Sequence, residues 1–449
     1  MLFVWIALVA LSSTGTYCQQ ASFRNYQVFR IVPSSLEQLE VLRQLEDTGN
    51  AGGYSYWIGP SFVSSKVDLM VAPDHLDEFT ELMNATDMSY HMYVKDVQKL
   101  IDQEQRSSEI RQAGSFGWTS YHTLDEIYAW MDQLAKDHPD NVELLVGGRT
   151  YQGREIRGVK LSFGSEKPGV FVEGGIHARE WISPATVTYL IDQFLNSQEP
   201  EVRELAESHD WYMFPSFNPD GYVHTHTSNR LWRKTLSKSG ILCKGADANR
   251  NWGFKWMSGG ASRNPCMETY AGKSAFSEIE TRTMSEFIKS LSGKLFAYIS
   301  FHSYSQLLLF PYGHTTEHLD NYDESVSATI ALYYGSYVIY QCIITTFRFI
   351  QQKAMGTKAI TALARRYGTK YTTGNIAETI YVASGSSMDW VKDTLKVPVS
   401  FTYELRDTGK HGFILPADQI IPNCEEVLDS FVAMFKEALK LGYPKTSGQ

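Results

Sequence analysis

Cysteine is scarce in this chain of 449 residues, which contains only five. So few cysteines exclude a small scaffold held together by many disulfides. No long run of lysine or arginine is present and the net charge is −9, so binding to nucleic acid is not expected. Aromatic residues are plentiful, with 26 tyrosines and 10 tryptophans. The chain is therefore long and apolar enough to bury a large core in two or three domains.

A short apolar run near the start of the chain, Leu2 to Leu11, is followed by small polar residues. The run is too short to span a bilayer, and the pattern is typical of a secretory signal peptide, although the usual positive charge before the run is missing. Thr16 and Cys18 are small enough to flank a cut before Gln19. We therefore expect residues 1–18 to be removed and the protein to be secreted. The alternative is a buried N-terminal strand.

A glycosylation sequon and a pair of cysteines are functionally relevant if the chain is secreted. The stretch Asn84 to Thr86 is a sequon for N-linked glycosylation, and the alternative is an unmodified surface asparagine. Cys243 and Cys266 enclose a loop rich in glycine and asparagine, and a bridge between them would stabilise the fold by about 3 kcal/mol in the chain-entropy model. Cys342 and Cys424 have no obvious partners.

Residues 23–110 have the pattern of a small α+β unit. Their order of strand, helix, strand, strand, helix, strand is the ferredoxin-like split pattern. The expected elements are a strand over 25–32, a helix over 34–45, strands over 54–58 and 66–71, a helix capped by Asp74 and ending at Met83, and a strand over 88–94. A charged helical connector follows over 95–112. It carries Arg106 and Arg111, after either of which a trypsin-like protease could cut.

From about Phe116 onward, strands and helices alternate, as in an α/β domain. Three predicted strands each run into a chemically reactive side chain: His177, His302 and Glu404. Open α/β sheets bind ligands outside the carboxyl ends of their strands. The three side chains are therefore expected to meet in one site.

The spacing of His177, Glu180 and His302 indicates a metal site. Gly174 and Gly175 allow a tight turn after a strand, just before the first histidine. Two imidazoles and a carboxylate are the ligands of a zinc site that keeps one position open for water. The alternative is a core histidine beside a structural glutamate.

Glu404 is the candidate general base, because zinc lowers the pKa of water and a nearby carboxylate could take the proton. The alternative is a structural salt bridge between Glu404 and Arg406.

Several arginines lie in polar and aromatic surroundings: Arg179, Arg230, Arg233 and Arg250. Arginine makes planar bidentate contacts with carboxylates. Arginines beside a zinc site therefore indicate a substrate with a free carboxylate and an oxyanion that needs stabilisation. Taken singly, each is better explained as a surface arginine in a salt bridge.

The segment Ser325 to Ile350 is apolar, β-branched and aromatic, without a clear helical stripe. It interrupts an otherwise amphipathic helix that would join Asp323 to Gln351. Tyrosine, serine, glutamine and threonine make it too polar for a membrane span. An inserted hairpin is one alternative. Our preferred interpretation is an insertion foreign to the fold, from splicing or from the gene model, and peptides from this stretch in the natural protein would contradict it.

These motifs resemble those of the zinc metallocarboxypeptidases of the pancreatic carboxypeptidase A/B type, which are made as secreted procarboxypeptidases. The resemblance runs from about Phe23 to near Gly442 and leaves out only residues 325–350. It implies a mixed, twisted, eight-stranded sheet with helices on both faces, preceded by a ferredoxin-like α+β pro-domain. The implied divisions are a signal peptide at 1–18, an inhibitory pro-domain with a connecting helix at 19–111, and a catalytic domain at 112–449.

The resemblance also implies a role for each candidate residue. The matches are His177, Glu180 and His302 as zinc ligands, Glu404 as general base, Arg233 as the group that polarises the scissile carbonyl, Asn249 and Arg250 as binders of the terminal carboxylate, Tyr381 as the mobile tyrosine that closes over it, Arg179 and Tyr304 as outer substrate contacts, and Cys243 with Cys266 as the disulfide. In relatives the bond before the residue matching Tyr304 is cis, and the same is expected here.

Met388 stands where A-type enzymes carry an apolar residue and B-type enzymes an aspartate. An apolar floor leaves a buried lysine or arginine side chain uncompensated, so aliphatic or aromatic C-terminal residues are the expected substrates. A B-type preference for basic residues is the less favoured alternative.

The implied protein is a monomeric, secreted exopeptidase precursor with one Zn²⁺ in its catalytic domain and no membrane span. Its expected partners are the C-termini of peptides and proteins and an activating trypsin-like protease, and a digestive lumen is its expected location. The pro-domain would cover the cleft until cleavage near Arg111. The rival from another class is a silent peptide-binding protein on the same scaffold, which would lack a ligand, base or arginine; this chain lacks none.

Overall fold

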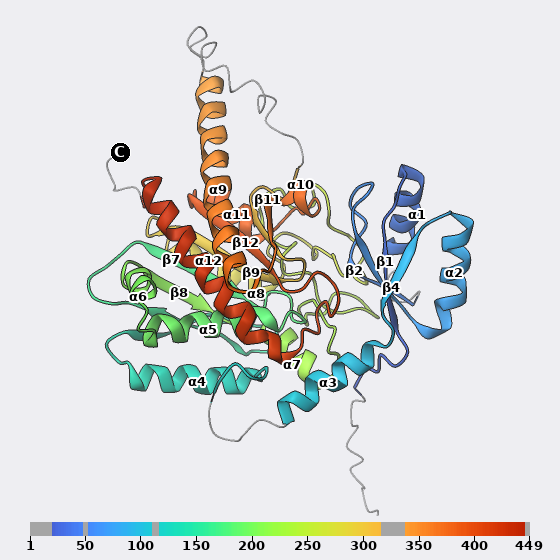
Figure 1. The fold of residues 1–449 in the computed structure, drawn as a ribbon, viewed down its shortest axis with the longest axis horizontal. Helices are drawn as coiled ribbons and strands as arrows, with labels where there is room; N and C mark the ends of the chain where they lie inside the picture. The colour runs from blue at the N-terminus through green and yellow to red at the C-terminus, as the bar shows by residue number, and fades with distance from the viewer. Residues whose placement is uncertain (1–19, 48–52, 110–115, 316–336, 445–449) are drawn as a thin grey trace, which may run out of the picture.

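The computed structural model describes residues 20–47, 53–109, 116–315 and 337–444. An N-terminal unit with a four-stranded sheet packs beside a larger unit with an eight-stranded sheet (Figure 1). Helix α3 (Val97–Glu109) follows the first unit and runs along the second. The predicted signal peptide and the predicted cleavage site at Arg111 lie outside the described residues.

The N-terminal unit has the predicted ferredoxin-like order. Its elements are β1 (Gln27–Ile31), α1 (Leu36–Asp47), β2 (Tyr54–Ile58), β3 (Val67–Val71), α2 (Leu76–Ala85) and β4 (Tyr90–Val94). The strands are arranged as β2-β3-β1-β4, and β1 is antiparallel to both of its neighbours. The prediction that Asp74 caps α2 is wrong. Pro73 begins a short 3-10 turn through His75, which shifts the helix start to Leu76 and leaves it without a side-chain cap.

The two faces of this small sheet pack against different partners, because successive side chains of a strand point to opposite faces. Phe29 and Leu69 join a core with Phe79 and Met83 of α2. On the other face, Val28, Trp57 and Met70 join a cluster with two side chains of the larger unit, Tyr304 and Phe413. The helices therefore lie on the face that is turned away from the larger unit.

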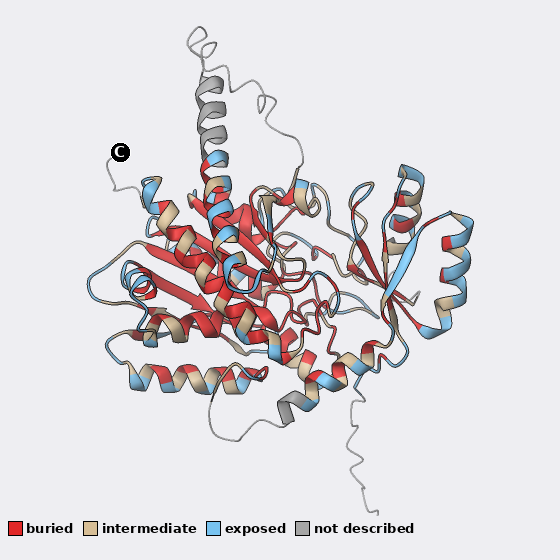
Figure 2. Cartoon of the chain, viewed as in Figure 1, coloured by how far each residue is buried: buried red, intermediate tan, exposed pale blue. Residues whose placement is uncertain are grey.

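The larger unit is built on a mixed sheet, as predicted. Its strands are β5 (Val142–Arg149), β6 (Glu155–Leu161), β7 (Gly169–Gly174), β8 (Asp210–Phe214), β9 (Leu295–Ser303), β10 (Leu307–Phe310), β11 (Thr372–Asn375) and β12 (Val399–Leu405). Their order is β11-β10-β12-β9-β7-β8-β6-β5. Every residue of the four central strands β12, β9, β7 and β8 is buried, as expected for strands covered on both faces (Figure 2).

Helices cover both faces of this sheet. They are α4 (Leu124–Asp137), α5 (Ile182–Asn196), α6 (Pro200–Glu207), α7 (Pro219–Thr227), α8 (Ile279–Ser290), α9 (Tyr337–Tyr367), α10 (Ile376–Thr379), α11 (Ser387–Thr394) and α12 (Ile420–Lys440). Val170 and Val172 of β7 face the core shared with α4, α5, α9 and α12. Phe171, between them, faces the core shared with α8 and α11.

The anomalous segment 325–350 is described only in part, since residues 316–336 lie outside the described ranges. From Tyr337 the backbone is the first part of α9, which extends beyond the sheet layer at this end (Figure 1). The later part of α9 is ordinary core, with Met355, Ala359 and Leu363 fully buried against the sheet and α12. The insertion hypothesis stays a prediction. No helix in the described ranges is both long and apolar enough to cross a membrane.

Candidate active site and metal centre

Three neighbouring parallel strands end at the same edge of the large sheet. His302 of β9 lies in register with Glu404 of β12, and β7 on the other side of β9 ends at Gly174. Gly175 then adopts a positive φ of 67° that an L side chain rarely takes, and the chain turns to present His177. The predicted convergence of the three side chains at one edge is confirmed.

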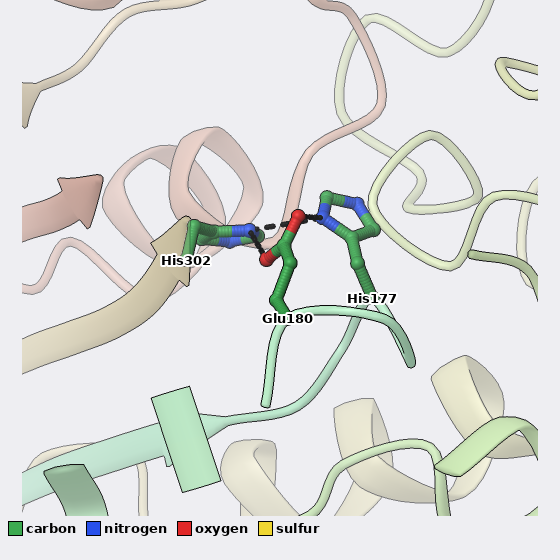
Figure 3. A group of neighbouring side chains, drawn as sticks. All are labelled: His177, Glu180 and His302. Carbon is green, nitrogen blue, oxygen red and sulfur yellow. Dashed lines mark hydrogen bonds and ion pairs between the residues drawn. The ribbon is translucent and has the colours of Figure 1, made fainter. Parts of the chain in front are cut away.

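The three predicted zinc ligands point toward one another (Figure 3). Glu180 lies between the two imidazoles, with 2.8 Å from its Oε1 to Nδ1 of His177 and 3.2 Å from its Oε2 to Nδ1 of His302. The ligand atoms all lie within 4.8 Å of one another, and all three residues are buried. Two imidazole nitrogens and one carboxylate oxygen at this spacing fit a single Zn²⁺ that keeps a further position open.

The electrostatics of these groups also favour a cation between them. Burial alone would raise the pKa of the Glu180 carboxyl, but the neighbouring imidazoles outweigh it and hold that pKa below its ordinary value. Burial would likewise lower the pKa of His302, but its contact with Glu180 raises that pKa to about 9. The pKa of His177 is lowered, chiefly by burial. Positive charge placed beside Glu180 is therefore stabilised.

Glu404 is buried beside His302, and burial raises the pKa of its carboxyl to about 8. The structural alternative for this residue is wrong. Arg406 points away from Glu404 and donates from Nε to Oε1 of Glu426 over 2.7 Å. Along β12 the two side chains alternate between the faces of the sheet, so Glu404 is directed to the site and Arg406 to α12.

Asp247 is a site residue that the sequence interpretation missed. This fully buried carboxylate lies 3.2 Å from Nε2 of His177, on the side of the ring away from Glu180. It also accepts hydrogen bonds from the Arg233 guanidinium at 2.7 Å and from the backbone N–H of Asn249 at 2.8 Å. Asp247 thus fixes one candidate metal ligand and two candidate substrate-binding positions at once. The available signal was its place two residues before Asn249.

Replacing Asp247 with asparagine is expected to weaken zinc binding by roughly 10- to 100-fold, because the partner that orients a ligating histidine contributes about that much. A competition titration with a zinc chelator measures the change. The control is Asp220→Asn, another buried carboxylate, which binds Thr150 and Arg154 and is expected to lose stability while keeping its zinc affinity. An unchanged affinity in the Asp247 variant would contradict the role assigned to this carboxylate.

Three of the four predicted arginines line one open cavity of about 580 Å³ between the two units. These are Arg179, Arg233 and Arg250, and Tyr381 lines the same cavity. The Arg250 guanidinium lies 5.6 Å from the centre of the Tyr381 ring. Arg233 connects this cavity to the three proposed zinc ligands, because its guanidinium lies 3.9 Å from Oε1 of Glu180.

Arg230, the fourth predicted arginine, belongs to a different contact. It forms a bidentate pair with Glu104 of α3, at 2.6 and 2.8 Å, and both side chains are almost fully buried. The guanidinium also lies 3.7 Å from the centre of the Trp181 ring. Arg230 therefore joins the two units and does not line the cavity. Its motif contained no signal for this, because Glu104 lies 126 residues earlier in the chain.

Tyr304 is also held by the N-terminal unit. Its hydroxyl donates to Asp68 at 2.7 Å, and its ring packs near Trp57. The bond between Ser303 and Tyr304 is cis, as predicted. Tyr304 is one of the two residues that the sequence assigned to outer substrate contacts. In this structure its side chain contacts the N-terminal unit instead.

Asn249 contacts the backbone of the residue that precedes Met388. The Asn249 Oδ1 accepts a hydrogen bond from the backbone N–H of Ser387 at 3.0 Å. Met388, only 2% exposed, follows in α11 and belongs to a buried apolar cluster with Trp252 and Trp390. An apolar side chain therefore stands close to the candidate carboxylate-binding residue.

The predicted bridge between Cys243 and Cys266 is present and closes the loop that carries Asn249 and Arg250. Cys424 is buried as a free thiol, while the side chain of Cys342 lies outside the described part of the structure.

Comparison with known proteins gives consistent matches across the chain. Residues 127–430 match the zinc carboxypeptidase family model, and residues 29–104 match the carboxypeptidase activation peptide model. Zinc carboxypeptidase A 1 of Anopheles gambiae is 44% identical, with coverage of 98% of this chain and 95% of that protein. Carboxypeptidase A1 of Bos taurus is 39% identical, with coverage of 92% and 93%.

Solved structures agree. Thrombin activatable fibrinolysis inhibitor matches with a TM-score of 0.79 at 29% identity, over 93% of this chain and all of that one. Carboxypeptidase A from Helicoverpa armigera has the same TM-score at 23% identity and shows the same fold over 94% of this chain and 99% of its own.

Proposed function

The chain belongs to the zinc carboxypeptidase family and carries its activation peptide, and from this premise we propose a secreted zymogen that removes apolar C-terminal residues from peptides. One observation carries the proposal: His177, Glu180 and His302 converge beside Glu404, and Arg233, which lines the neighbouring cavity, lies 3.9 Å from Oε1 of Glu180. The divisions proposed are a signal peptide at 1–18, a pro-domain at 19–111 and a catalytic domain at 112–449.

His177, Glu180 and His302 are the proposed holders of Zn²⁺. When bound, zinc supplies a Lewis acid that lowers the pKa of water and polarises the scissile carbonyl. Glu404 acts as the general base: its carboxylate accepts the proton of the attacking water and returns it to the leaving amine. Burial raises the pKa of Glu404, and a divalent cation held by the three proposed ligands would oppose that shift and keep the carboxylate available near neutral pH.

The arginines are proposed to bind the negative charges of the substrate and of the transition state. Arg233, held by Asp247, is proposed to stabilise the oxyanion that develops on the scissile carbonyl. Arg250 and Asn249 are the proposed partners of the terminal carboxylate, with Tyr381 closing over it. A site that needs a free carboxylate at this position accepts only the last residue of a chain, which is the basis of exopeptidase action.

The buried position of Met388 supports a preference for aliphatic or aromatic C-terminal residues. A lysine or arginine side chain beside this methionine would be desolvated without an ionic partner. Tyr304 and Arg179 are proposed to contact residues further from the C-terminus.

The N-terminal unit is proposed to inhibit the enzyme by covering the cavity. Trp57 and its neighbours in β2 line the cavity opposite the arginines, and Asp68 holds Tyr304. Cleavage in the stretch near Arg111 would free this unit. The mature enzyme is proposed to act as a monomer in a digestive lumen.

The test is a secreted full-length protein assayed on a hippuryl-phenylalanine type substrate before and after trypsin. Activity on this substrate is expected to rise after cleavage, and a zinc chelator is expected to abolish it, with return of activity on adding Zn²⁺. A full-length protein whose rate is unchanged by trypsin would contradict inhibition by the N-terminal unit. Zinc binding without any turnover would favour the silent peptide-binding alternative.

A further inference from the structure

The sequence holds one sequon for N-linked glycosylation, Asn84-Ala85-Thr86. It lies in the N-terminal unit, at the last turn of α2, which ends at Ala85. The catalytic part of the chain contains no such triplet. A secreted protein with this distribution has one candidate attachment point, and that point lies in the piece that activation removes.

Asn84 is on the outermost layer of the zymogen. The inner side of α2 buries Phe79 and Met83 in the small core, while Asn84 is exposed. Because α1 and α2 cover the sheet face opposite Trp57 and Met70, the helix stands away from the catalytic unit (Figures 1 and 2). A bulky sugar chain at this position meets neither the cavity nor the contact between the units.

The local backbone also leaves room for attachment. Asp87 takes a positive φ of 50° and its N–H bonds to the carbonyl of Asn84 at 3.3 Å, so the chain turns sharply just after the sequon. The Thr86 hydroxyl donates to the carbonyl of Leu82 at 2.7 Å. These bonds use the backbone and the threonine, and neither needs the amide nitrogen of the Asn84 side chain.

We infer that Asn84 carries an N-linked glycan in the secreted zymogen and that activation removes this glycan together with the pro-domain, leaving the catalytic domain unmodified. The inference rests on the secretion included in the proposed function. In the modification, Nδ2 of Asn84 loses a proton and forms a bond to the anomeric carbon of an oligosaccharide. The bond that breaks joins that carbon to its lipid diphosphate carrier, which leaves.

The experiment uses the full-length chain secreted from insect cells. Treatment with an N-glycosidase is expected to increase the gel mobility of the zymogen. After trypsin, the same treatment is expected to shift the pro-domain fragment and leave the catalytic fragment unchanged. Mass spectrometry should place the sugar, or the aspartate that the glycosidase leaves, at Asn84.

Two variants of Thr86 form a matched pair. Thr86→Ser keeps both the sequon and a hydroxyl and is expected to keep the glycan, whereas Thr86→Val is expected to lose the glycan. Asn84→Gln is also expected to lose the glycan, although it leaves the hydrogen bond from Thr86 to the Leu82 carbonyl intact. A zymogen that is secreted and activatable but unmodified would overturn the inference and leave the proposed function standing. A chain that never leaves the cell would instead overturn the secretion on which both depend.

Discussion

The Glu404→Gln variant is expected to lose roughly 10²- to 10⁴-fold in kcat/KM after trypsin activation, the range found for removal of a general base. Glutamine has nearly the same shape but cannot accept the proton of the attacking water. Its zinc content is expected to equal that of the parent, because Glu404 is not one of the three proposed ligands. Steady-state kinetics together with metal analysis on the same sample measures both quantities.

The structure explains why this variant should fold. Within the described ranges Glu404 takes part in no ion pair, and burial already disfavours its charged form, raising its pKa to about 8. A neutral amide at this position therefore leaves no buried cation without its partner.

The matched control is Glu426→Gln, a buried glutamate that pairs with Arg406. That variant leaves the Arg406 guanidinium without its carboxylate, so it is expected to lower the free energy of unfolding while the activity of the folded fraction remains. If Glu404→Gln kept more than about a tenth of the parent activity, its role as the general base would be wrong.

The sequence was sufficient to predict which side chains meet at the sheet edge. His177, His302 and Glu404 each lie at or just after the end of an apolar strand. Because the carboxyl ends of parallel strands meet at one edge of a sheet, the local sequence pattern was enough to predict that these distant residues lie close together. The order of elements along the N-terminal unit was also predictable, because strand, helix, strand, strand, helix, strand is the ferredoxin-like split pattern.

Contacts between side chains far apart in sequence were not predictable. Nothing in the motif around Arg230 indicates Glu104, and nothing in the strand around Asp68 indicates Tyr304. Both pairs depend on how the two units dock, which is decided by surface shape and not by periodicity. The prediction that Asp74 caps a helix was wrong for a local reason. Pro73 begins a 3-10 turn at this point, and the helix starts only after it.

Asp247 illustrates an intermediate case. Its sequence neighbours, Asn249 and Arg250, were assigned to the substrate because they resemble a known motif. A carboxylate that only orients other groups has no distinctive spacing of its own, so its importance became visible from its contacts with His177 and Arg233.

Met388→Asp is the second variant with a large expected effect. The methionine is 2% exposed in an apolar cluster, so an aspartate there would be desolvated and would gain a partner only when a substrate brings a cation. The ratio of kcat/KM for a C-terminal arginine over a C-terminal phenylalanine is expected to rise by at least about a hundredfold, since a site with a buried polar group discriminates strongly against substrates that leave it unpaired. Assays of paired peptides that differ only in the last residue measure this ratio.

Two further variants separate charge from shape in this experiment. Met388→Leu keeps the pocket apolar and is expected to keep the preference for phenylalanine, while Met388→Asn has the size of aspartate without its charge and should not favour arginine. A lower free energy of unfolding is expected for both the asparagine and the aspartate variants, with the larger loss for aspartate, because a buried unpaired carboxylate costs more than a buried unpaired amide. If the aspartate variant stayed folded and bound zinc but its preference for phenylalanine did not change, the floor of the specificity pocket would have to lie elsewhere, and the buried cluster around Trp252 and Trp390 would then be structural only.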